Sequence, residues 1–256
     1  MIHPTAIIDP NAELASDVTV GPYTIIDARV QIDSGTTIGP HVVIRGPTRI
    51  GKDNRIFQFT SVGEDPQDKK YHGENTRLEI GDRNVIREYC TLHRGTIQDK
   101  EITRIGSDNL LMAYTHVAHD CQVGNHVIMA NAASLAGHVS VEDHSILGGF
   151  SLVHQFCKIG QHSFAAMGSV ISRDIPPYVM VGGRPTKPHG INTVGLERQG
   201  FSQEALRQIR KAYKIIYKSG FKLEDAARML DEMGSETPEV VCLAEFLKHT
   251  GRSIIR

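Results

Sequence analysis

The chain of 256 residues is 40% hydrophobic and contains 24 Gly, 11 Pro and no Trp, a composition that favours many turns around a core of small residues. Its formal net charge is -1, so it lacks the basic excess of a protein that binds nucleic acid or an anionic membrane. No apolar run approaches the ~20 residues that a transmembrane helix needs, and the N-terminal residues lack the basic and apolar regions of a signal peptide.

An aliphatic residue recurs at every sixth position from Ile2 to Val62. Two further runs, Ile80 to Leu92 and Ile105 to Ile171, keep the spacing of six residues, with Met129 and Ala165 among their members. The next residue is often Gly, which we interpret as a tight corner, and the fourth residue after the aliphatic is mostly small or β-branched. A six-residue unit with two inward positions is too short for a helix. The pattern therefore predicts short strands and corners stacked into a parallel β-helix, in which neighbouring coils bury each other's faces.

This pattern resembles the hexapeptide-repeat acyltransferases, whose left-handed β-helix completes one coil in three hexads. The left hand follows from the resemblance alone, because the general rule for crossover connections favours the right hand. Residues 18 apart in the sequence are then expected to stack at the ~4.8 Å strand spacing.

Two segments, residues 63–79 and 93–104, break the six-residue register. We predict that both are loops that leave the coils, and functional sites tend to lie on loops of a rigid scaffold. After Pro176-Pro177 the hexads stop altogether.

Three helices are predicted beyond the repeat. The first begins at Ser202 and ends near Gly220, and the second runs from Leu223 to Met233. The third covers residues 238–249, with Thr237 as N-cap and a Pro at its first position. The expected fold is mainly β: a left-handed parallel β-helix over 1–190 with its two loops, followed by a small C-terminal α-helical domain over 191–256.

A histidine-rich segment lies in the middle of the third run. On the 18-residue spacing, His119 falls beside Gly137, and Asp120 falls beside His138. A base that takes a proton from a hydroxyl, next to an N–H that receives an oxyanion, is the layout of an acyl-transfer site. Spacing alone does not separate this interpretation from surface decoration.

Other histidines have simpler interpretations. His126, His144 and His162 fall in one column, which we interpret as solvated corner surface. A zinc site of the kind found in hexapeptide-repeat carbonic anhydrases is a competing hypothesis for the segment, but His116 and His119 lie three apart on one corner and do not converge easily. We therefore expect no metal.

The cysteines do not suggest chemistry. Cys90, Cys121 and Cys157 each follow an inward aliphatic by four positions, so we predict buried, inert thiols. Together with Cys242 they show neither CxxC spacing nor a disulfide framework, which fits a reducing cytoplasm.

Longer segments carry a more specific resemblance, which extends over essentially the whole chain. The stretches GDRNVIREYCTLHRGT, SDNLLMAYTHVAHDCQVGNH and LVHQFCKIG are similar to those of the UDP-N-acetylglucosamine acyltransferases that begin lipid A synthesis. The resemblance implies a homotrimer with active sites between neighbouring β-helices. It also implies transfer of an (R)-3-hydroxyacyl group from acyl carrier protein to the 3-hydroxyl of UDP-N-acetylglucosamine, with no cofactor. The sequence does not distinguish this acceptor from its 3-amino analogue.

By matched motif, His119 would be the general base, Asp120 would orient it or stabilise its charged form, and the Gly137 N–H would hold the oxyanion. A base that titrates near neutral pH suits this step. The chain departs from the family pattern at Val194 and Gln199, where an acid and an Arg are common. The resemblance implies the following substrate-binding residues: Gln67, Asp68, Lys70, Tyr71, His93, His116, Asn131, His138, His154, Gln155, Asn192 and Arg198.

Met167 is expected to limit the length of the acyl chain. It stacks over Gly149 and then Asn131 on the 18-residue spacing. In this family a glycine at that position leaves a groove for a longer acyl chain, so a bulky residue implies a shorter one, about ten carbons. Filling a gap in the packing is the simpler alternative.

The segment from Arg198 to Lys222 has seven basic residues and one acid. A charged helix face is usually only solvated, but an acidic carrier protein would be steered by such a patch. We predict that the patch consists of Arg207, Arg210, Lys211 and Lys214.

Three alternatives remain at the level of the sequence. Another hexapeptide-repeat acyltransferase, such as an N-acyltransferase of the same pathway or an acetyl-CoA enzyme, is the closest one. A zinc carbonic anhydrase of the same fold and a β-solenoid scaffold without catalysis are the others.

Overall fold

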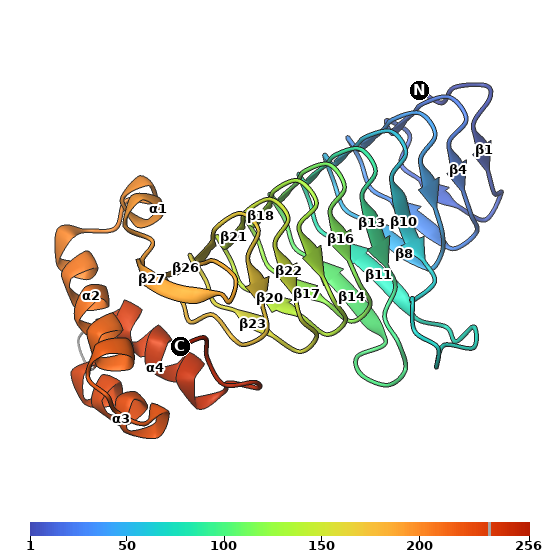
Figure 1. Ribbon diagram of the computed structural model, residues 1–256. Helices are drawn as coiled ribbons and strands as arrows, with labels where there is room; N and C mark the ends of the chain where they lie inside the picture. Colours follow the sequence, from blue (N-terminus) through green and yellow to red (C-terminus); the bar gives the residue numbers. More distant parts are fainter. Residues whose placement is uncertain (235–236) are drawn as a thin grey trace.

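The computed structural model, which describes residues 1–234 and 237–256, is a three-sided β-helix with a group of helices at its C-terminal end (Figure 1). Each coil gives one short strand to each of three sheets, and strands of successive coils pair in parallel. Paired residues are mostly 18 apart, as in Ile7↔Ile25 and His116↔Ser134. The predicted mainly β fold of stacked coils is therefore confirmed.

The first sheet consists of β1 (Ile7–Ile8), β4 (Ile25–Ile26), β7 (Val43–Ile44), β10 (Ser61–Glu64), β13 (Thr91–His93), β16 (His116–Val117), β19 (Ser134–Leu135), β22 (Leu152–Val153) and β25 (Val170–Ile171). The second consists of β2 (Glu13–Leu14), β5 (Val30–Ile32), β8 (Thr48–Ile50), β11 (Arg77–Ile80), β14 (Ile102–Ile105), β17 (Gln122–Val123), β20 (Ser140–Val141) and β23 (Lys158–Ile159). The third consists of β3 (Thr19–Val20), β6 (Thr37–Ile38), β9 (Arg55–Ile56), β12 (Val85–Ile86), β15 (Leu110–Leu111), β18 (Ile128–Met129), β21 (Ile146–Leu147), β24 (Phe164–Ala165), β26 (Val179–Gly182) and β27 (Lys187–Ile191).

The chain runs from the first sheet to the second, then to the third and back to the first. We call the turns after these sheets the first, second and third corners.

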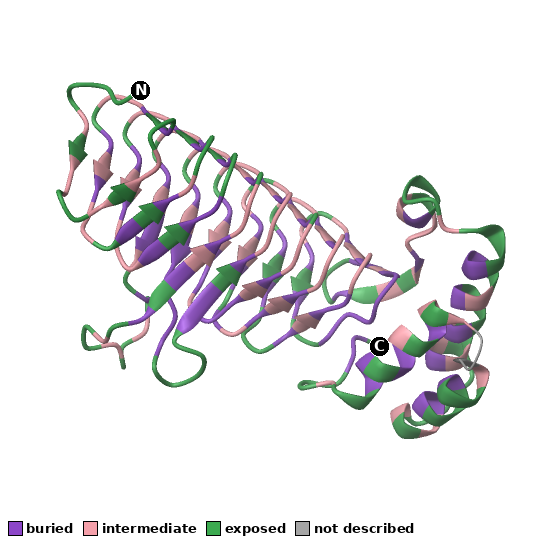
Figure 2. Ribbon diagram, turned by 180° about the vertical axis from the view of Figure 1, so that it is seen from behind, coloured by how far each residue is buried: buried purple, intermediate pink, exposed green. Residues whose placement is uncertain are grey.

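The inward aliphatic residues from Val20 to Ile171 form one continuous buried core along the coils (Figure 2). Each buried aliphatic side chain contributes roughly 1.5–3 kcal/mol, and because its partners lie in adjacent coils, no coil is stable alone. Cys90, Cys121 and Cys157 are fully buried in this core, as predicted.

Except for Gly63 (φ 75°), the glycines after the inward aliphatics lack left-handed backbone and so do not have the role that we predicted. Left-handed φ angles occur two residues further on, at side chains such as His126 (φ 55°) and His144 (φ 59°). A Cβ on Gly124 would lie 2.2 Å from Oδ1 of Asp143, and one on Gly148 would lie 2.6 Å from the backbone nitrogen of Met167. Glycine is therefore needed there because adjacent coils approach closely.

Two loops leave the coils, residues 65–76 between β10 and β11 and residues 94–101 between β13 and β14 (Figure 1). Both are shorter than the predicted segments 63–79 and 93–104. The reason is that backbone pairing continues into their ends, where Glu64 pairs with His93 and Arg77 with Ile102.

The strands end in an antiparallel hairpin of β26 and β27, and four helices follow in the described residues: α1 (Thr193–Arg198), α2 (Gln203–Lys218), α3 (Leu223–Gly234) and α4 (Pro238–Lys248). Ser202 caps α2, because its side chain accepts the Ala205 N–H at 3.1 Å. Thr237 is the N-cap of α4 but forms no side-chain cap bond. Helix α1 was not predicted, since one and a half turns carry no periodic signal.

A second core joins the helices to the end of the β-helix. It includes Tyr178 and Ile191 from the strand region together with Leu206 and Ile209 of α2. The C-terminal residues return to the coils, where Asp174 Oδ2 accepts the Gly251 N–H at 2.9 Å. Among the described residues, no helix has the length and apolar character to cross a bilayer.

Candidate active site

The first corner brings together the four residues at the centre of the sequence-based hypothesis. His119 and Asp120 lie between β16 and β17, and Gly137 and His138 lie one coil further, between β19 and β20. The backbone N–H of His138 donates to the carbonyl oxygen of His119 at 3.0 Å. The 18-residue repeat therefore places side chains of adjacent coils side by side at a turn, where their polar groups point away from the core.

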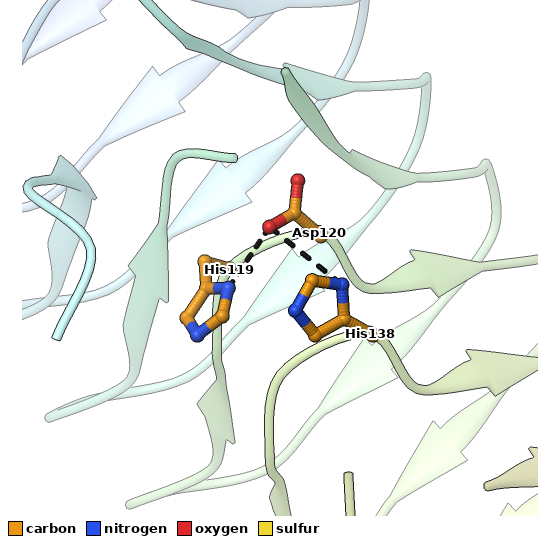
Figure 3. A group of neighbouring side chains, drawn as sticks. All are labelled: His119, Asp120 and His138. Atoms are coloured by element: carbon orange, nitrogen blue, oxygen red, sulfur yellow. Dashed lines mark hydrogen bonds and ion pairs between the residues drawn. The ribbon is translucent and has the colours of Figure 1, made fainter. Parts of the chain in front are cut away.

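The His119 ring is oriented by Asp120. Its Nδ1 lies 2.9 Å from Oδ2 of Asp120, and the side chain is only 12% exposed (Figure 3). An ionised carboxylate can only accept, so Nδ1 carries the hydrogen and Nε2 of the neutral ring keeps a free lone pair. Nε2 has no hydrogen-bond partner among the described residues. The ring therefore presents a base at the edge of the corner.

Asp120 is buried and held in its charged form. Burial by itself would raise its pKa, but hydrogen bonds from His119 and Thr96 outweigh that effect and lower it. Thr96 donates its backbone N–H to both carboxylate oxygens, at 2.9 and 3.1 Å, and its hydroxyl to Oδ2 at 2.6 Å. The Asp120 N–H donates to Oγ1 of Thr103 at 2.8 Å. The carboxylate is thus negative at neutral pH and faces the imidazole.

Gly137 makes room for the imidazole ring. A Cβ built on Gly137 would lie 2.5 Å from Cε1 and 2.7 Å from Nε2 of His119. The Gly137 N–H forms no hydrogen bond within the described residues. A free backbone donor therefore lies next to a base, which is the pairing that acyl transfer requires.

His138 completes the cluster. Its Nδ1 lies 2.9 Å from Oδ2 of Asp99. The same atom lies 3.9 Å from Oδ2 of Asp120 (Figure 3). Its ring stacks on Phe156 with centroids 4.4 Å apart and meets the His119 ring edge-on at 5.0 Å.

The cluster has the dimensions of a possible metal site. One ligand atom from each of His119, Asp120 and His138 can be chosen so that all three lie within 4.8 Å of one another. However, His119 and Asp120 already lie at hydrogen-bond distance from each other, and His138 pairs with Asp99. The Nδ1 atoms of both histidines are therefore already paired with carboxylates, and metal analysis of the purified protein tests the zinc alternative.

Two further histidines lie beside the cluster on the first sheet. Nδ1 of His116 is 2.7 Å from Oγ1 of Thr91, and Nδ1 of His93 is 2.5 Å from the carbonyl oxygen of Asp65. Burial, with repulsion from the neighbouring histidines, lowers the pKa of His116 to about 4, and burial also lowers the pKa of His93. Both rings are therefore neutral near pH 7 and act as hydrogen-bonding groups.

The loop 65–76 is tied to the coils by a buried arginine that the sequence analysis missed. Arg94 donates to the carbonyl oxygen of Gly63 at 2.7 Å and to the Tyr71 hydroxyl at 2.9 Å, and it forms an ion pair with Asp65. Tyr71 therefore anchors the loop. The predicted contacts Gln67 and Lys70 are exposed, whereas Asp68 accepts the Lys70 N–H at 3.0 Å.

Several predicted substrate contacts lie away from His119 within one chain. His154 and Gln155 are exposed at the first corner, two coils beyond it. Asn131 and Met167 are exposed at the third corner, on the opposite edge of the first sheet, and Met167 is 78% exposed.

Asn192 and Arg198 belong to the helical end. Asn192 caps α1 by accepting the Gly195 N–H at 3.2 Å, and its Nδ2 donates to the carbonyl oxygen of His162 at 3.0 Å. Arg198 is exposed in the last turn of α1. A single chain therefore does not bring these two residues to His119.

The histidine column at the second corner is only partly solvated surface. His126, His144 and His162 stack with centroids 4.7 and 4.6 Å apart. His126 is exposed, but His162 is covered by Tyr178 and Phe201, and burial, with repulsion from His144, lowers its pKa to about 4. The interpretation as solvated surface is therefore wrong for His162.

The predicted carrier-protein patch lies on one exposed face of α2. Arg207, Arg210, Lys211 and Lys214 are separated by three, four and seven positions, and their opposite face is the buried one. Arg207 pairs with Glu204, whereas the other three form no ion pair within the described residues. Most of the positive charge therefore remains available.

The repeat, the parallel coils and the His119–Asp120 pair at a corner define the class of the protein, a hexapeptide-repeat transferase. Residues 102–137 match the family model described as bacterial transferase hexapeptide (six repeats), and residues 174–255 match the second domain of UDP-N-acetylglucosamine O-acyltransferase. The sequence is 57% identical over 255 residues to the acyl-[acyl-carrier-protein]--UDP-N-acetylglucosamine O-acyltransferase of Alkalilimnicola ehrlichii, covering 100% of this chain and 99% of that protein. The chain belongs to the UDP-N-acetylglucosamine O-acyltransferase family.

Solved structures agree. LpxA of Acinetobacter baumannii is 52% identical and superimposes with a TM-score of 0.98, covering 100% of this chain and 99% of that one. The UDP-N-acetylglucosamine acyltransferase of Arabidopsis is 34% identical, with a TM-score of 0.87 and complete coverage of both chains.

Proposed function

We propose that the chain transfers an (R)-3-hydroxyacyl group from acyl carrier protein to the 3-hydroxyl of UDP-N-acetylglucosamine, the first step of lipid A synthesis. The observation that carries this proposal is the His119–Asp120 pair with a free Nε2, next to the free N–H of Gly137. The names of relatives that match the full length supply the substrates.

In the proposed mechanism, Nε2 of His119 takes the proton of the sugar hydroxyl as its oxygen attacks the thioester carbonyl. The carbonyl oxygen becomes negative and is held by the Gly137 N–H. When the intermediate collapses, the C–S bond breaks and the leaving thiolate takes the proton back from His119. Asp120 stabilises the imidazolium between these steps, and no acyl-enzyme or cofactor is required.

The arrangement of the remaining contacts calls for a second copy of the chain. We infer a homotrimer with sites between subunits, in which Asn131, Met167, Asn192 and Arg198 reach a neighbour's His119. Exposed apolar side chains along the first sheet and its two corners, of a kind that marks an interface, support this: Phe150, Leu152, Phe156, Met167 and Val170. Left-handed coils, division into domains at 1–190 and 191–256, and a cytoplasmic location belong to the same proposal.

The test is transferase activity of the purified protein with UDP-N-acetylglucosamine, its 3-amino analogue and hydroxyacyl carrier proteins of several lengths. We expect His119→Ala to lower kcat by about 10²–10⁴-fold, the usual contribution of a general base. His126→Ala, an exposed histidine outside the cluster, is the matched control and should retain activity. A wild-type protein without activity on either acceptor would refute the proposal, and bound zinc would favour the anhydrase alternative.

A further inference from the structure

The loop 94–101 lies against the catalytic cluster and supplies two of its contacts. Thr96 donates to the carboxylate of Asp120, 24 residues later, and Asp99 pairs with His138, 39 residues later. One inserted segment therefore contacts a residue in each of two adjacent coils.

Thr96 controls the orientation of the Asp120 carboxylate. Oδ2 accepts hydrogen bonds from both the Thr96 hydroxyl at 2.6 Å and the His119 ring at 2.9 Å. Both Thr96 and Asp120 are about 1% exposed, so water does not compete for these oxygens. The hydroxyl therefore helps to set the direction in which Oδ2 faces the imidazole.

We propose that Thr96 is a positioning residue for catalysis, which acts through Asp120 to align the His119 base. This inference rests on the proposed function of the cluster. A charge-assisted hydrogen bond is short and directional, so loss of the hydroxyl leaves Oδ2 held only by the longer Thr96 N–H bond and by His119, and the alignment of the imidazole loosens. Substrate does not need to touch Thr96, and the effect falls on kcat because binding groups elsewhere are unchanged.

Thr103 provides a matched control. It is also buried and also bonds Asp120, but its hydroxyl accepts the backbone N–H at 2.8 Å and does not touch the carboxylate. Thr103→Val and Thr96→Val therefore remove the same group from the same neighbourhood. Only Thr96→Val removes a hydrogen-bond donor from Oδ2 of Asp120, the oxygen that faces His119.

The experiment measures kcat and KM for both substrates in full-length wild-type protein, Thr96→Val, Thr96→Ser and Thr103→Val, together with thermal unfolding of each. We expect Thr96→Val to lower kcat roughly 10- to 100-fold with little change in KM, as expected for a lost hydrogen bond to a charged group. Thr96→Ser keeps the hydroxyl and should restore most of kcat. Thr103→Val should lose stability comparably and lose much less kcat than Thr96→Val.

Two results separate this inference from the proposed function. If wild-type protein is active and folded Thr96→Val has an unchanged kcat, the positioning role is refuted and the proposed function stands. Equal losses of kcat in Thr96→Val and Thr103→Val, without rescue by Ser, would show a structural role and also refute it. An inactive wild-type protein refutes the proposed function, and the inference falls with it.

Discussion

Replacing Gly137 with alanine tests whether the site depends on the close approach of two coils. The added Cβ would lie 2.5 Å from Cε1 of His119, whereas carbon atoms normally approach to about 3.5–4.0 Å. The ring edge must therefore move by about 1 Å or more. The coil cannot yield easily, because the Gly137 carbonyl accepts the Phe156 N–H at 3.2 Å and the His138 N–H is bonded to His119.

The expected consequence is a loss of catalysis that exceeds the loss of stability. A displacement of about 1 Å at a reacting group can cost on the order of 10²-fold in rate, and here it also strains the 2.9 Å bond to Asp120. Overpacking at a tight site costs about 1–3 kcal/mol. The ring is partly exposed and can rotate outward, so we expect the lower end of that range.

The assay compares kcat and the urea unfolding midpoint for wild type, Gly137→Ala and Gly251→Ala. Gly251 is a suitable control because a Cβ there meets its nearest atom, the Phe156 carbonyl oxygen, at 3.7 Å. Alanine at position 137 keeps the backbone N–H that we propose as the oxyanion donor. A loss of activity in Gly137→Ala therefore reflects displacement of the His119 ring. Unchanged kcat in folded Gly137→Ala would refute the argument that this glycine makes room for the base.

Three further predictions follow from other parts of the molecule. Met167→Gly should shift the preference toward longer acyl donors, and an unchanged chain-length profile would contradict this. Arg210 and Lys211 form no ion pair within the described residues, so reversing their charges should raise KM for acyl carrier protein at low salt and leave KM for UDP-N-acetylglucosamine unchanged. Equal changes in the two KM values would count against a carrier-protein patch. The pKa of His162 is lowered to about 4 in the folded chain, against about 6.5 in the unfolded chain. Between these pH values the unfolded chain binds more protons, so stability falls as the pH drops through that window. His162→Phe should reduce this fall, measured as the difference between thermal melts at pH 6.5 and 4.5, and a fall equal to that of the wild type would refute the prediction.

The repeat could be predicted because each hexad buries the same position. One inward aliphatic every six residues forces a strand, a turn and a stack of coils, whatever the outward side chains are. The same spacing placed His119 beside Gly137 without any structural data. Helices α2 to α4 were found by their periodicity and caps, and their ends agree within one or two residues.

The local pattern of residues is therefore enough to predict the scaffold and the pairs of residues that lie one coil apart. The contacts of Thr96 with Asp120, of Asp99 with His138 and of Arg94 with the loop 65–76 could be seen only in the folded chain, because these three residues lie in or at the start of an inserted loop that follows no period. The folded chain also explains the corner glycines: adjacent coils approach closely there, and apart from Gly63 the left-handed backbone lies at other positions. Both findings depend on contacts between residues that are far apart in the chain, and a local sequence pattern does not predict which distant residues come into contact.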